Sequence, residues 1–121
     1  MELNEKIESI AAEYGFDIQA VKLAEECAEY AAISLKILYY RLLLDQSDML
    51  ELDPDIISKK LDEAREKGTE KLTDVLILAR QVENFITKQP EARKMIDKLM
   101  NEKADRQLKR IKEELKKEGT K

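Results

Sequence analysis

Histidine and tryptophan are absent from this 121-residue sequence, and glycine, proline and cysteine are rare, at three, two and one. Without histidine, the chain cannot use an imidazole as a general base, as a zinc ligand or in the Glu-x-x-His motif of ferritin-like di-iron bundles. Any bound metal must therefore be held mainly by oxygen. The single Cys27 excludes a disulfide within the chain and fits a reducing compartment.

Long apolar runs are also lacking. No stretch of 18 apolar residues occurs, so we expect no membrane-spanning helix. The acidic, polar start of the chain lacks the basic and apolar regions of a secretory signal, which favours a cytoplasmic protein. Residues 1–90 hold 11 basic against 19 acidic residues, a net charge of −8 that disfavours general nucleic-acid binding.

Helix formers are abundant. Alanine, leucine, glutamate, lysine and isoleucine dominate, and 40% of the residues are charged. The composition predicts an all-α fold, a helical bundle of four to five helices in one domain over residues 1–121, with a core at about 17–115 and a frayed tail at 116–121. Periodicity predicts helices at about 3–14, 17–44, 54–87 and 90–115. Gly68 either interrupts the third of these or lies within it.

Three local signals mark the expected helix ends. Gly15 is placed as the residue that ends the first helix. Asp17 is placed as the N-cap of the second, and Asp53-Pro54 as the N-cap and first residue of the third.

The second helix carries more apolar surface than one chain can bury. Its first half has one apolar face, formed by Val21, Ala24, Ala28, Ala31 and Leu35. Its second half, residues 37–44, is apolar nearly all round. We therefore expect a subunit interface here, in a dimer or tetramer.

Two groups of carboxylates suggest a site. Glu25 and Glu26 lie four and three residues before Glu29, so like charges share one region of a helix, where they repel. Asp74 is the only charge in the window 72–79, and Glu70 lies one turn before it. An unpaired carboxylate is costly to bury, and hard cations such as Mg²⁺ favour carboxylate oxygens. The alternative interpretation is that these are solvated faces with ordinary ion pairs.

The pattern Lys22-Leu23-x-Glu25-Glu26-x-x-Glu29, followed by Asp74-Val75-Leu76, resembles the MazG-like all-α NTP pyrophosphohydrolases. That family carries Glu-x-x-Glu on one helix and Glu-x-x-Asp on a later one. The resemblance covers about residues 17–86. It implies a helical homo-oligomer that uses Mg²⁺, or Mn²⁺, to cleave a nucleoside triphosphate into the monophosphate and pyrophosphate.

The resemblance also implies roles for individual residues. Metal ligands would be Glu26, Glu29, Glu70 and Asp74, the catalytic base would be Glu25, and the phosphate contacts would be Lys22 and Lys71. The second half of the motif departs from the family, because lysine occupies position 71, where the family has glutamate. The alternative is a catalytically inactive helical oligomerisation or adaptor protein of the same fold.

Overall fold

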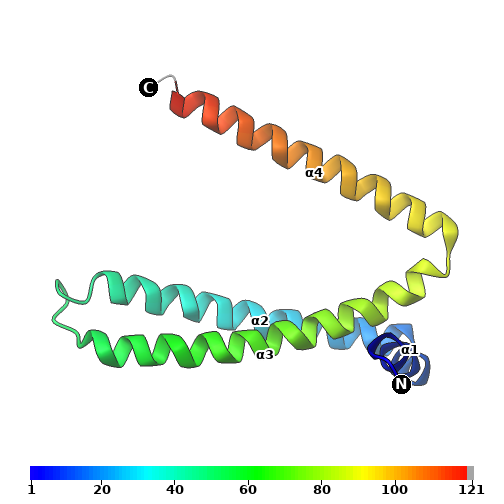
Figure 1. The fold of residues 1–121 in the computed structure, drawn as a ribbon, viewed down its shortest axis with the longest axis horizontal. Helices are drawn as coiled ribbons and strands as arrows, with labels where there is room; N and C mark the ends of the chain where they lie inside the picture. The colour runs from blue at the N-terminus through cyan, green and yellow to red at the C-terminus, as the bar shows by residue number, and fades with distance from the viewer. Residues whose placement is uncertain (120–121) are drawn as a thin grey trace. The chain divides into compact units, whose positions relative to one another are not determined.

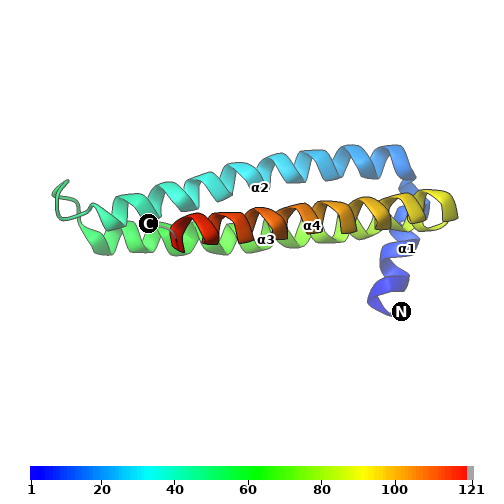
Figure 2. The same cartoon turned by 90° about the horizontal axis from the view of Figure 1, so that it is seen from above.

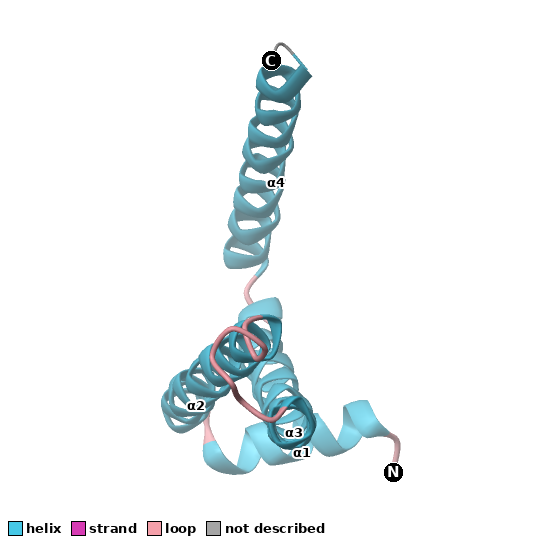
Figure 3. Cartoon of the chain, turned by 90° about the vertical axis from the view of Figure 1, so that its left-hand side faces the viewer, coloured by secondary structure: helices cyan, strands magenta, loops and turns pink. Residues whose placement is uncertain are grey.

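A computed structural model describes residues 1–119, and most of these residues lie in α-helices. It contains α1 (Leu3–Tyr14), α2 (Phe16–Asp45), α3 (Pro54–Thr87) and α4 (Pro90–Gly119), and these residues form no strand (Figures 1 and 3). The prediction of an all-α fold is confirmed, with four helices. In the described residues no helix is both long and apolar enough to cross a membrane.

Two of the three predicted helix ends are confirmed. Gly15, at a φ of +85°, ends α1, and its N–H donates to the carbonyl of Ala11 at 2.9 Å. The carboxylate of Asp53 accepts the N–H of Asp55 at 3.0 Å, so it caps the helix that Pro54 begins. The prediction for Asp17 is wrong. Because Gly15 lets the chain turn within one residue, α2 begins at Phe16. Asp17 therefore lies inside the first turn of α2, and its side chain makes no capping hydrogen bond.

The chain divides into two compact units, residues 1–84 and the segment from Phe85 onward. In the first, α2 and α3 form an antiparallel pair joined by the loop 46–53, and α1 packs at the N-terminal end of α2 (Figures 1 and 2). The buried apolar side chains of this unit come from α1 and α3: Ile7, Ala11, Ile57, Leu61 and Ala64.

Gly68 lies inside α3, which settles the question of an interruption there: the helix runs unbroken from Pro54 to Thr87. Gly68 is buried against α2. A Cβ atom added to it would lie 3.2 Å from Cδ1 of Ile37 and 3.4 Å from Cγ2 of Ile33. The glycine therefore serves helix packing rather than a turn.

We expect Gly68→Ala to change the free energy of unfolding by less than about 1 kcal/mol, because the gain in helix propensity offsets a tight contact with a flexible isoleucine end. Gly68→Leu should destabilise by about 1–3 kcal/mol through overpacking. Urea unfolding measures both, and Thr69→Leu, at the exposed neighbouring position, is the control. If Gly68→Leu and Thr69→Leu lower the free energy of unfolding equally, the close packing of Gly68 against Ile33 and Ile37 is contradicted.

The apolar face of α2 points away from α3. This face, which runs from Val21 to Leu35, is exposed, and its spacing continues through Leu38 and Leu42. The side facing α3 instead carries residues 19, 22, 26, 29, 33, 37 and 40, a line that we call the α2–α3 seam. In α3, periodicity predicts that Leu72 and Leu76 point inward, but both are exposed.

The second unit contains α4, which has no buried residue. The spacing of Ala104, Leu108, Ile111 and Leu115 predicts a narrow coiled-coil-like line. The three large side chains of this line, Leu108, Ile111 and Leu115, are more than half exposed. The helix extends to Gly119, past the predicted end at Leu115, and residues 120–121 of the predicted frayed tail lie outside the described residues.

Candidate functional site

The α2–α3 seam changes character along its length. Near the loop it is apolar, with Ile33 and Ile37 against Gly68. Toward α1 it becomes polar for four successive positions of α2, which are Gln19, Lys22, Glu26 and Glu29. Apolar side chains at such positions normally supply the stability of a helix pair. Polar residues here therefore indicate a site rather than a packing surface.

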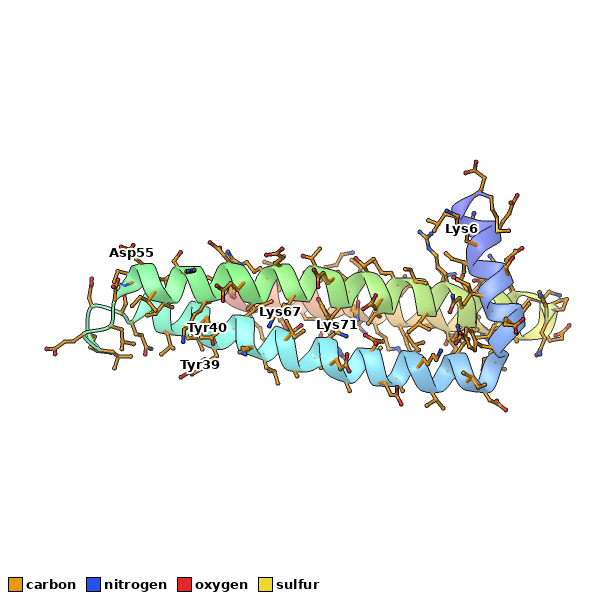
Figure 4. All side chains as sticks on the ribbon, turned by 90° about the horizontal axis from the view of Figure 1, so that it is seen from below. Lys6, Tyr39, Tyr40, Asp55, Lys67 and Lys71 are labelled. Atoms are coloured by element: carbon orange, nitrogen blue, oxygen red, sulfur yellow. The ribbon has the colours of Figure 1, made fainter. Side chains whose placement is uncertain are left out.

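Lys71 of α3 is the centre of this polar stretch (Figure 4). Its Nζ lies 2.5 Å from Oε2 of Glu29, 3.2 Å from Oε2 of Glu26 and 4.0 Å from Oδ2 of Asp74. Carboxylates from two helices, Glu26 and Glu29 of α2 and Asp74 of α3, thus converge. The group that they surround is an ammonium. We call these four residues the Lys71 cluster.

The Lys71 cluster keeps its central charge across the physiological pH range. Hydrogen bonds to Glu29 and then Glu26 raise the pKa of Lys71 well above its usual value of about 10.5, against a smaller lowering by burial. The side chain is 32% exposed, so solvent screens these contacts. Three carboxylates and one ammonium leave a net charge of −2, which favours a further cation.

The raised pKa gives a stability prediction with a definite sign. A group whose pKa is higher in the folded state stabilises the fold fully below its unfolded pKa, and this stabilisation is lost as pH rises through the folded value. Lys71→Met should therefore lower the urea midpoint by a constant amount from pH 7 to about 10, and by less above that. Lys67→Met, one turn away, is the control. If the difference in urea midpoint between Lys71→Met and the unmodified protein narrows between pH 7 and 9, the raised pKa of Lys71 is contradicted.

The other predicted site residues lie outside the Lys71 cluster. Glu25 and Glu70 are exposed, and neither side chain forms an ion pair or hydrogen bond with another residue of the described range 1–119. Lys22 is on the seam, with its Nζ 4.0 Å from the centre of the Tyr14 ring in a cation–π contact. Within residues 1–119, no three acidic or cysteine side chains are placed to hold a metal ion without rearrangement.

The sequence analysis missed two residues, Gln19 and Gln81. They are 1% and 2% exposed, and Nε2 of Gln19 donates to Oε1 of Gln81 across the seam. Both line a cavity of about 360 Å³ that also reaches Glu26 and Asp74. The available signal was spacing: Gln19 lies seven residues before Glu26 and Gln81 seven after Asp74, so each falls on the same helix face as a predicted carboxylate.

Comparison with known proteins adds no further constraint on this site. No protein-family model, curated protein or solved structure matches the sequence.

Proposed function

We propose that the protein is a Mg²⁺-dependent nucleoside triphosphate pyrophosphohydrolase, which cleaves the bond between the α and β phosphates to give a monophosphate and pyrophosphate. The observation that carries this proposal is the convergence of Glu26, Glu29 and Asp74 from two helices beside a cavity. The resemblance of the carboxylate pattern to the MazG-like enzymes supports the same reaction. A cytoplasmic location, where nucleotides are abundant, is part of the proposal.

The residues present suit a divalent cation in charge and in chemistry. Carboxylate oxygens are the preferred protein ligands of Mg²⁺, and the cluster has a net charge of −2 even with Lys71 in place. Glu26, Glu29 and Asp74 would hold the ion once the flexible lysine side chain swings aside, and exposed Glu70 is one turn from Asp74. A bound Mg²⁺ would supply neutralisation of phosphate charge and activation of water.

The basic residues of the seam have a matching role. Lys22 lines the cavity that Glu26 and Asp74 also line, so its ammonium can contact a phosphate there. Lys71, displaced from the carboxylates, can contact a phosphate that enters with the cation. Glu25 is the proposed base that accepts a proton from the attacking water, and it reaches this role only by reorientation, since it is exposed.

Release of pyrophosphate from the four common NTPs and dNTPs, with Mg²⁺ or Mn²⁺, tests the proposal. We expect Glu26→Gln to lower kcat/KM by at least about 100-fold, because it removes a negative ligand from the side that faces α3. Glu66→Gln, an exposed carboxylate of α3 outside the cluster, should retain full activity. Absence of release from every nucleotide would falsify the enzymatic proposal.

A specific observation favours the second candidate, a catalytically inactive helical oligomerisation or adaptor protein. Lys71 already neutralises part of the charge that a metal would neutralise, and it does so from within the chain. Under this proposal Lys71 replaces the metal as a structural element. Unchanged thermal stability in millimolar Mg²⁺, together with no turnover, would distinguish it from the first.

We also propose that the protein is a homodimer in which α2 of one copy packs against α2 of the other. The exposed face of α2 has the 3–4 spacing of a coiled-coil seam over six intervals: Val21, Ala24, Ala28, Ala31, Leu35, Leu38 and Leu42. Three alanines in its first half permit close approach of the helices. A second copy of the α2–α3 pair would complete a four-helix bundle.

A further inference from the structure

The most unusual polar groups in the molecule are the two buried glutamines. Both are almost fully inaccessible, although glutamine is mostly a surface residue. The one hydrogen bond between them uses Nε2 of Gln19 and Oε1 of Gln81. Oε1 of Gln19 has no hydrogen-bond partner among the described residues. A buried acceptor without a donor is costly and rare, and it indicates a missing partner.

The cavity next to this pair has two chemically different ends. At one end are the Gln19–Gln81 amides, with the apolar side chains of Ile77 and Leu78. Further along the two helices are the carboxylates of Glu26 and Asp74, each seven residues from its glutamine, with Lys22 between Gln19 and Glu26 on α2. Its volume of about 360 Å³ is at the lower end of the range of about 300–1,000 Å³ for small-molecule sites.

A nucleotide has the same division between its two ends. Its base is flat and apolar on its faces, with hydrogen-bond donors and acceptors along one edge, whereas its phosphates are anionic. Gln19 and Glu26 are seven residues apart on α2, or about 10 Å at about 1.5 Å per residue. An extended nucleotide spans a comparable distance between its base and its phosphates.

We infer that the Gln19–Gln81 end of the cavity recognises the nucleobase: when the amide pair parts to admit the base, the buried Oε1 of Gln19 accepts an N–H of the base edge, and the pair determines base specificity. Bases held in protein pockets are read in this way, by hydrogen bonds to the base edge between aromatic or apolar side chains. Tyr14 of α1 lines the same cavity and contributes an aromatic wall, held against Lys22. This inference rests on the proposed function for the identity of the ligand as a nucleotide.

The test is equilibrium binding, which does not require turnover. Dissociation constants for the monophosphates of the four common bases and for inorganic tripolyphosphate are measured by calorimetry with Mg²⁺. We expect the protein to prefer one base at least about tenfold, because a buried amide left unpaired rejects a mismatched edge. In Gln19→Met and Gln81→Met, which keep the side-chain volume, the preference should fall below twofold while tripolyphosphate binds as before. Gln107→Met, in α4, is the control.

A second measurement covers the case in which these variants do not fold. In the unmodified protein, the side-chain NH₂ resonances of Gln19 and Gln81 should shift when the preferred nucleoside, without phosphate, is added. Equal affinity for all four bases, or a preference that persists in folded Gln19→Met, overturns the inference, as does the absence of any shift.

The outcomes separate the inference from the proposed function. Pyrophosphate release without base preference overturns the base site and leaves the enzyme. Base-selective binding without pyrophosphate release overturns the enzyme and leaves the base site.

Discussion

Lys71→Glu should create strong Mg²⁺ binding, with an affinity at least about tenfold higher than that of the unmodified protein. The substitution changes the net charge of the cluster from −2 to −4 and removes the ammonium that Glu26 and Glu29 now surround. Four carboxylates around one point repel each other without a cation, so the metal-free variant should be less stable. Added Mg²⁺ should restore its stability, because an ion that binds only the folded state stabilises that state.

Calorimetric titration measures the Mg²⁺ affinity. Thermal unfolding is then compared without Mg²⁺ and at an Mg²⁺ concentration of about 5 to 10 times the measured Kd. Lys67→Glu adds the same charge one turn earlier on α3, outside the cluster, and should leave Mg²⁺ affinity within about twofold, which separates a formed site from general attraction. If the two variants bind Mg²⁺ equally, the carboxylates do not form a common site. If the substitution also raises pyrophosphate release, Lys71 limits the activity of the natural sequence.

Leu35→Glu should convert the proposed dimer into a monomer. Leu35 is 68% exposed and lies on the apolar line of α2 that faces away from α3. In a dimer it would be buried, and a carboxylate there would lose its hydration without a partner. We expect the dissociation constant to rise at least about 100-fold, equivalent to about 2.7 kcal/mol. The monomer should also unfold at lower urea concentration, since so little apolar surface is buried within one chain.

Sedimentation velocity over a range of protein concentrations measures the change. Arg41→Glu also introduces a carboxylate into exposed surface of α2, but outside the apolar line, and should leave the dimer intact. If the unmodified protein sediments as a monomer at micromolar concentration, the proposed interface is wrong. Equal dissociation by both variants would show that charge, rather than the apolar line, governs association.

The fold could be predicted from the sequence to a large extent, because its signals are local. Gly15 and Asp53-Pro54 mark helix ends through backbone geometry and hydrogen bonds that involve only neighbouring residues. The continuity of α3 through Gly68 could not be predicted, since an isolated glycine is compatible with a helix interior and with a helix end. Only the contacts with Ile33 and Ile37 explain why glycine is required there.

The candidate site could be predicted in part. The spacing of Glu26 and Glu29 placed them on one helix face, and the structure brings Asp74 to them from α3. That Lys71 would be the centre of the cluster depended on a contact between residues that are 45 positions apart in the sequence. Gln19 and Gln81 could not be predicted as site residues, because amides carry no charge and their burial depends on the packing of two helices.

The sequence by itself determined the all-α fold and most of the helix ends, since propensity, capping and periodicity act within a few residues. The tertiary structure decided which face of α2 meets α3. That helix has two lines of residues with coiled-coil spacing, one apolar and one largely polar in its first half, and periodicity does not say which line faces which neighbour. The choice depends on the packing of α2 against α3, and this packing gathers three carboxylates, one lysine and two glutamines in one place.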